Sequence, residues 1–222
     1  MSTDAPVPDR FGLETSLSRD RLSTYQHATS SFEEAWALYA WNLRASSALL
    51  PTLAVFEVTL RNTISAAIAG VHGPEWPWSP GFQRALPQPQ KGFCPRSELL
   101  GRAAKHSTVG RVVADLKFVF WEKMLNARHH RNIWEQQMPR LFPHSTSSSA
   151  DLQRQKVMAV VARVRTLRNR VAHHEPIFRR DLMADVSGMM EVLRGQNTDL
   201  ADWLDAAASA QRVLQQQPKV KS

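Results

Sequence analysis

The side chains best suited to chemistry lie in one short stretch, Arg168-Asn169-Arg170-Val171-Ala172-His173-His174. An imidazole accepts and releases a proton near neutral pH, and a guanidinium matches the charge and geometry of phosphate oxygens. On a helix, Asn169 and His173 lie one turn apart on the same face, where Asn169 can hold the imidazole tautomer or hydrogen-bond a phosphate. The stretch therefore fits cleavage of RNA, because the 2′-hydroxyl of RNA is itself the nucleophile and the protein need supply only proton transfer and a fixed cation.

An amphipathic helix must position this stretch. At about 100° per residue, the apolar side chains before it fall on one arc that faces a core: Val157, Val160, Val161, Val164, Leu167 and Val171. Arg168 lies at the border of this arc. Pro176 disfavours a helical Glu175 and so ends the helix, which places both histidines in its last turn. A purely structural interpretation also stands, in which Arg168 pairs with Glu57 and the histidines are favourable cations at a helix end.

Composition indicates a soluble globular protein. The 222 residues are 43% hydrophobic and 22% charged, and the formal net charge of +8 favours a polyanionic partner. The single cysteine, Cys94, excludes an internal disulfide and a cysteine-based zinc site and suits a reducing cytoplasm. The histidines show no helical pair at zinc-binding spacing, so neither a metal site nor a cofactor is expected. Residues 1–10 have no apolar core and are not a signal peptide.

The first half of the chain predicts two long helices after a loose leader at residues 1–16. One helix begins at Ser30 or Ser31 and ends near residue 45, and a very apolar helix spans 49–70 with Pro51 in its first turn. Within the second helix, Glu57 and Arg61 are four apart, in the favourable order for an ion pair. These two charges argue against a membrane span. They are either a structural pair or, with Asn62, polar groups beside a site.

The second half predicts further helices around an irregular insert at residues 72–104. Proline density forbids long helices in the insert, which Trp76 and Trp78 are expected to pin as packing anchors. A helix is predicted at 108–127, another at 182–194 closed by Gly195, and a last one from Asn197 or Thr198 to 214, before a frayed tail at 215–222. No strand pattern or repeat is present, so residues 17–214 are predicted to form one all-α domain.

The ordered set of sequence blocks resembles the Abi-like (abortive infection) family of the HEPN superfamily, over roughly residues 17–203. The blocks are Leu17-Ser18 with Arg21-Leu22 and Tyr25; Leu38-Tyr39 with Trp41-Asn42; Glu57 with Leu60-Arg61-Asn62; His106 with Phe118-Val119-Phe120-Trp121; and Leu167 to Pro176.

The resemblance implies a HEPN-like helical bundle and a metal-independent ribonuclease that cuts single-stranded RNA. HEPN nucleases have an arginine, commonly followed by a polar residue, and a histidine after four to six intervening residues. Those positions fall here on Arg168, Asn169 and His173. The remaining candidates, for supporting or RNA-contacting roles, are His174, Arg165, Arg170, Glu57, Arg61 and Asn62.

The resemblance further implies a phage-defence effector or toxin, with an antitoxin or regulator as a possible partner. The alternative is a non-catalytic HEPN module that binds RNA or a cognate regulatory protein. HEPN motifs are often juxtaposed across a dimer, and a two-fold interface brings the same patch from both subunits together. A homodimer is therefore expected, with Ile177 and Phe178 as candidate interface residues. It would join two copies of the basic segment 163–180, which holds six arginines and one acid.

Overall fold

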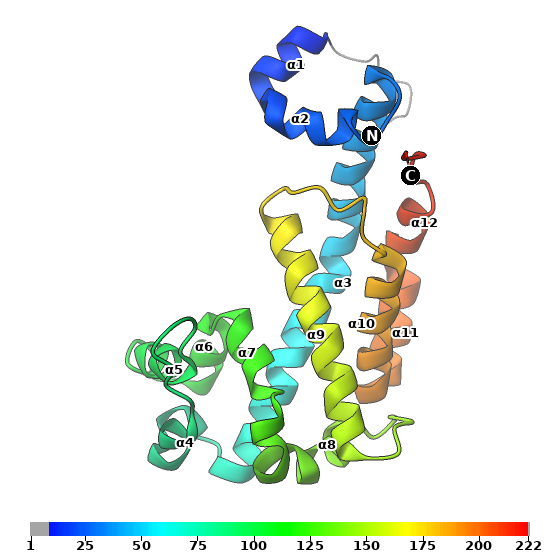
Figure 1. Ribbon diagram of the computed structural model, residues 1–222. Coiled ribbons are helices and arrows are strands. Elements are labelled where there is room, and N and C mark those ends of the chain that lie inside the picture. The colour runs from blue at the N-terminus through cyan, green and yellow to red at the C-terminus, as the bar shows by residue number, and fades with distance from the viewer. Residues whose placement is uncertain (1–8, 222) are drawn as a thin grey trace.

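The computed structural model describes residues 9–221, and this part of the chain is helical and contains no strand (Figure 1). The prediction of an all-α fold is confirmed. The helices are α1 Arg10–Leu17, α2 Arg19–Gln26, α3 Phe32–His72, α4 Pro80–Ala85, α5 Pro95–Ala103, α6 Val109–Asp115, α7 Phe118–Met124, α8 Glu135–Leu141, α9 Ala150–Ala172, α10 Leu182–Gln196, α11 Thr198–Ala207 and α12 Ala210–Leu214. Shorter 3₁₀ turns occupy Trp76–Trp78 and Ala127–His129, and a π-helical turn spans His130–Trp134.

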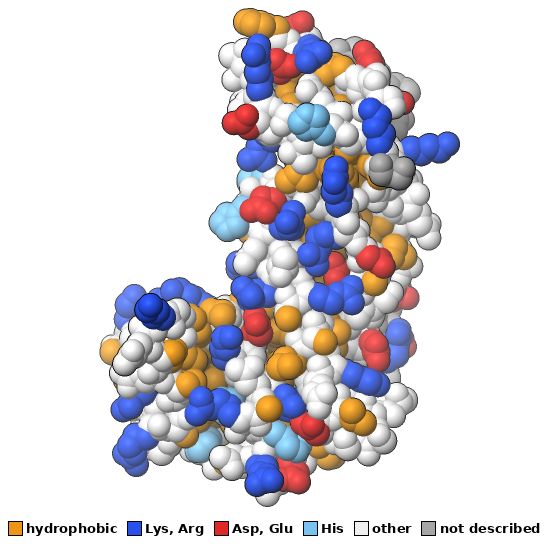
Figure 2. Space-filling view, in the orientation of Figure 1, with side chains coloured by type: hydrophobic (Ala, Val, Ile, Leu, Met, Phe, Trp, Pro, Cys, Tyr) orange, Lys and Arg blue, Asp and Glu red, His pale blue; other side chains and the backbone are white. Residues whose placement is uncertain are grey.

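The helices form a long shaft with a lobe at one side and an arm at one end. Figure 1 shows α9, α10 and α11 running alongside α3, with α4 to α7 grouped beside one end of α3 and α1 and α2 at the other. Figure 2 shows that the lobe and the shaft enclose an open angle. The end of α9 that bears the histidines points toward the arm.

The long helix α3 corrects two predictions about the first half of the chain. The helices predicted to end near 45 and to begin at 49 are one continuous helix of 41 residues. Pro51 has no N–H to donate to the Ser47 carbonyl one turn earlier. Both residues are exposed, so water can bond that carbonyl and the helix continues. The prediction of a loose leader is also wrong for residues 10–16, which belong to α1. Residues 1–8 of the predicted leader lie outside the described residues.

Helix α3 is the one helix of the described chain that is long and apolar enough to span a membrane by length and composition. Its apolar face packs against α2, α7, α8, α9, α10 and α12. The side chains of Leu38, Trp41, Leu49, Phe56 and Ile64 are almost fully buried in the protein. A core helix of a helical bundle accounts for these features.

Helix α9 follows its predicted pattern closely. Ser149 caps its first turn by accepting a hydrogen bond from the Leu152 amide (3.2 Å). Of the predicted apolar arc, all residues are buried except Val160, which is half-buried. The helix ends at Ala172, so His173 is its cap and His174 lies just beyond, rather than in the last turn as predicted.

The lobe contains more regular structure than the proline content suggested. The insert 72–104 includes the short helices α4 and α5, and Trp76 is fully buried while the Trp78 indole donates to the Ala103 carbonyl (3.0 Å). The two tryptophans are packing anchors, as predicted. The helix predicted at 108–127 is broken at Leu116 and Lys117, which both adopt extended backbone. This break lets Val112 of α6 and Phe120 of α7 reach the same core.

The C-terminal region is divided and anchored. The predicted last helix is two helices, α11 and α12, separated by an extended residue at Ala208. The prediction of a frayed tail is wrong for residues 215–221. Gln217 Nε2 donates to the Phe178 carbonyl (2.8 Å), and the Lys221 amide donates to the Ala28 carbonyl (2.8 Å). The tail thus joins the turn after α2 to the loop that follows α9.

Candidate functional site

A shallow groove of about 490 Å³ lies between α3 and the end of α9 that bears the histidines. Helix α3 lines it with Leu43, Ser47, Leu50, Leu53, Ala54 and Glu57, and the chain near the end of α9 lines it with Arg168, Val171, Ala172 and His174. Most of the lining side chains are apolar, and the ionisable ones are Glu57, Arg168 and His174. The structure therefore places Glu57 in one groove with Arg168 and His174, which lie more than a hundred residues later in the sequence.

Arg168 and Glu57 form an ion pair across the groove, with 3.5 Å between Arg168 Nε and Glu57 Oε2. The contact that the structural interpretation required is present. The Arg168 side chain is 44% exposed and that of Glu57 is 23% exposed. A pair this accessible to water adds little stability, so the guanidinium can exchange its partner for a phosphate at small cost.

Asn169 and His173 lie one turn apart, as predicted, and the His173 amide donates to the Asn169 carbonyl (2.9 Å). Neither side chain hydrogen-bonds to another of the described residues, and neither lines the groove. His173 is exposed and Asn169 is half-buried. The Asn169 amide and the His173 imidazole therefore lie on the face of the helix end beside the groove-lining face, where they are free to contact a ligand.

His174 has an unusual backbone for a side chain with a Cβ atom. Its φ of 55° lies in the left-handed region, where glycine is usual. The Glu175 amide donates to the Arg170 carbonyl (2.8 Å), and the His174 amide donates to the Val171 carbonyl (3.2 Å). These bonds close the end of α9 in a Schellman-type turn. His174 thus has a structural position as well as a side chain in the groove.

Much of the positive charge of the segment 163–180 is balanced by acids within one chain. Arg165 pairs with Glu122 of α7, and Arg170 Nε lies 3.9 Å from Glu175 Oε2. Both oxygens of the buried Asp185 on α10 are bound by arginines. Arg163 Nη2 lies 2.9 Å from one oxygen and Arg180 Nη2 lies 2.9 Å from the other.

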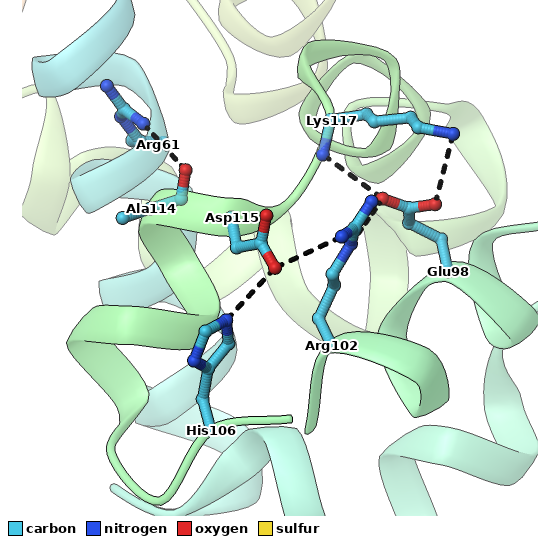
Figure 3. Close-up of polar contacts among 7 residues, drawn as sticks. All are labelled: Arg61, Glu98, Arg102, His106, Ala114, Asp115 and Lys117. Carbon is cyan, nitrogen blue, oxygen red and sulfur yellow. Dashed lines mark hydrogen bonds and ion pairs between the residues drawn. The ribbon is translucent and has the colours of Figure 1, made fainter. Parts of the chain in front are cut away.

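Arg61 and Asn62 do not join the motif. The ion pair predicted between Glu57 and Arg61 does not form among the described residues, because Glu57 pairs with Arg168 instead. Arg61 Nη1 donates to the Ala114 carbonyl of α6 at 3.4 Å (Figure 3). Arg61 and Asn62 line a separate groove of about 480 Å³ between α3 and α6.

His106, which belongs to the resemblance blocks, lies in a polar cluster of the lobe (Figure 3). His106 Nε2 is 3.0 Å from Asp115 Oδ2, and Arg102 joins Asp115 to Glu98. The hydrogen bond from His106, with Arg102, holds the pKa of the Asp115 carboxyl below its usual range. Each acid of this cluster already has cationic partners, so the cluster joins α5 to α6 and is not a second site.

The interface residues predicted from sequence are wrong. Ile177 is fully buried and Phe178 is 3% exposed, because the chain after Pro176 turns into the core. The exposed apolar side chains beside the motif are Leu43 and Leu50 of α3, which are 40% and 53% exposed. Leu43 and Leu50 are seven residues apart, which places them on the same face of a helix. That spacing could have indicated from the sequence that the two leucines share an exposed face.

Arg21 is named among the resemblance blocks but not as a site residue, and sequence reasoning missed its contact with the motif. Its Nη1 atom donates to the His174 carbonyl at 2.6 Å, across 153 residues of sequence. No local pattern around Arg21 indicates this contact. Within residues 9–221, no three His, Cys, Asp or Glu side chains converge as the protein ligands of a metal ion would.

No protein-family model, curated protein or solved structure matches the chain.

Proposed function

We propose that the protein is a metal-independent endoribonuclease of the HEPN type that cleaves single-stranded RNA in the cytoplasm as a phage-defence effector or toxin. The observation that supports this most is the end of α9, where Arg168 lies in an open groove and the Asn169 and His173 side chains have no hydrogen-bond partner among the described residues. Polar groups of complementary chemistry left accessible at one helix end are suited to a ligand.

The reaction proposed is transesterification within RNA. His173 removes the proton of a 2′-hydroxyl, whose oxygen attacks the adjacent phosphorus while the bond to the 5′-oxygen breaks. Arg168 leaves Glu57 and stabilises the charge that develops on the phosphorane oxygens. Asn169 orients the imidazole or the phosphate. The leaving 5′-oxygen takes up a proton from water to give a 5′-hydroxyl, a 2′,3′-cyclic phosphate remains on the other fragment, and His173 returns its proton to the solvent.

Cleavage by the purified protein is expected to continue in EDTA and to leave 2′,3′-cyclic phosphate or 3′-phosphate ends. The reason is that the candidate groups are an imidazole, an amide and a guanidinium, which bind divalent cations poorly in this combination. The measurement is cleavage of mixed cellular RNA with EDTA or magnesium, followed by analysis of the fragment ends. Loss of cutting in EDTA and recovery with magnesium would show that this mechanism is wrong.

The working unit proposed is a homodimer in which the two motifs face each other. One helix end supplies only one set of catalytic groups. In the dimer, the partner copy places a second imidazole or a second arginine on the other side of the phosphate. Leu43 and Leu50, exposed beside Arg168, are the residues that a partner copy can cover.

Replacing Leu50 by glutamate is expected to convert the dimer to a monomer, because it buries a charge in the interface. Leu152, which is 47% exposed at the other end of α9, is a matched control whose replacement by glutamate should leave the dimer intact. Sedimentation across a concentration series measures the change. A wild-type protein that is fully active as a monomer would refute the dimer.

The pairing of the arginines favours the alternative of a non-catalytic module that binds RNA or a cognate regulatory protein. Arg168 already has Glu57 as an ion-pair partner, and most of the other arginines of the segment 163–180 are also paired. The protein would then bind RNA or a regulator without cutting. Binding of single-stranded RNA that is unchanged in His173→Ala, with no cleavage by the wild type, would identify this function.

A further inference from the structure

The loop that begins at the second histidine, residues 174–178, is held by side chains from three distant parts of the chain. Arg21 of α2 donates to the His174 carbonyl (2.6 Å), and Asn42 Oδ1 of α3 accepts from the Ile177 amide (2.8 Å). Gln217 of the tail donates to the Phe178 carbonyl (2.8 Å). Three long-range hydrogen bonds on one short loop fix its backbone far more firmly than a surface connection requires.

Helix α2 is itself firmly placed, so Arg21 can act as a fixed donor. Ser18 caps α2 by accepting from the Arg21 amide (3.3 Å). Tyr25, one turn after Arg21, is buried, and its ring lies 5.2 Å from that of Tyr39 and 5.3 Å from that of Phe178. One face of α2 therefore packs on α3 and on the loop, and Arg21 reaches the turn between them.

The contact falls where the backbone most needs support. His174 adopts the left-handed conformation at φ 55°, which costs free energy for a residue with a Cβ atom. Its carbonyl receives a charge-assisted hydrogen bond from Arg21 of α2, which is stronger than a neutral one. Arg21 forms no ion pair within 4 Å among the described residues, and its guanidinium bonds to this carbonyl instead.

We infer that Arg21 is a positioning residue, which holds the turn at His173 and His174 so that both imidazoles keep a fixed direction relative to Arg168. The inference rests on the proposed function for its catalytic consequence. The bracing of the turn is a physical property that can be measured without any activity. A small displacement of a reacting group from its productive geometry slows the chemical step more than it weakens substrate binding.

The test compares Arg21→Ala and Arg21→Lys with Arg19→Ala. Arg19 is a matched control because it is an exposed arginine of the same helix, and its side chain pairs with Glu14 instead of the loop (3.0 Å). For Arg21→Ala we expect kcat to fall roughly 10- to 100-fold with KM nearly unchanged. A lysine can still donate to the carbonyl, so Arg21→Lys should recover part of kcat.

Nuclear magnetic resonance supplies the readout that does not depend on cleavage. In Arg21→Ala the signals of residues 173–175 should shift, and the Glu175 amide, which bonds to the Arg170 carbonyl, should exchange about tenfold faster with solvent. Arg19→Ala should change neither. Unchanged signals and exchange at 173–175 in Arg21→Ala would overturn the inference, as would a loss of kcat matched by an equal loss of folded protein. If the wild type cuts no RNA, the proposed function fails, while the exchange measurement still decides whether Arg21 holds the turn.

Discussion

Alanine at position 173 is expected to reduce RNA turnover by roughly 10²–10⁴-fold, the usual contribution of acid–base catalysis, and to leave the fold intact. His173 is exposed, its side chain has no hydrogen-bond partner among the described residues, and only its backbone bonds to α9. Removal of the imidazole therefore costs no packing. Single-turnover cleavage measures the loss, and circular dichroism with thermal unfolding verifies the fold.

The comparison with His174 needs a substitution that suits the backbone. Alanine at this position retains a Cβ atom in the left-handed region, so its effect mixes strain with the loss of the imidazole. His174→Gly removes the side chain and relieves the strain, because glycine adopts this conformation without penalty. His174→Gly should be at least as stable as the wild type and should lose less turnover than His173→Ala.

The opposite result has a definite meaning. If His174→Gly abolishes turnover and His173→Ala retains it, the catalytic imidazole is the one that shares the groove with Arg168. If both variants cut RNA at the wild-type rate, the proton transfer proposed for this turn does not occur there.

The double replacement Arg163→Ala/Arg180→Ala is expected to lower the free energy of unfolding by about 3–5 kcal/mol, because it leaves a buried carboxylate unpaired. The Asp185 side chain is 2% exposed, and each of its oxygens is bound by one of these arginines. Urea unfolding at constant pH measures the difference. The single replacement Asp185→Asn should cost less, because the two arginines are partly exposed and can turn toward water.

Two controls separate this buried pair from ordinary surface charge. Adding Asp185→Asn to the double variant should restore stability, because the unpaired charge is then absent. Arg194→Ala, which breaks an exposed pair with Asp202, should change stability little. A double variant as stable as Arg194→Ala would mean that Asp185 is hydrated and that the two arginines do not hold α9 and α10 together.

Local sequence determined helix α9 and the residue types of the motif. The apolar arc of α9, its Ser149 cap and its end before Pro176 follow from side-chain periodicity and backbone rules that act over a few residues. The spacing of four residues that places Asn169 and His173 one helical turn apart is equally local. These features are local, so one segment contains all the information that they require.

Long-range packing decided which charges meet and which surfaces stay open. Glu57 had a local partner at Arg61 by spacing, but α9 packs against α3 in the folded protein and Arg168 takes that place. Ile177 and Phe178 looked available because they follow a helix end, yet the loop turns inward and buries them, and Leu43 and Leu50 remain exposed instead. Arg21 reaches His174 only because α2 folds back across α3. Such contacts depend on the relative placement of whole helices, which side-chain spacing within one helix does not encode.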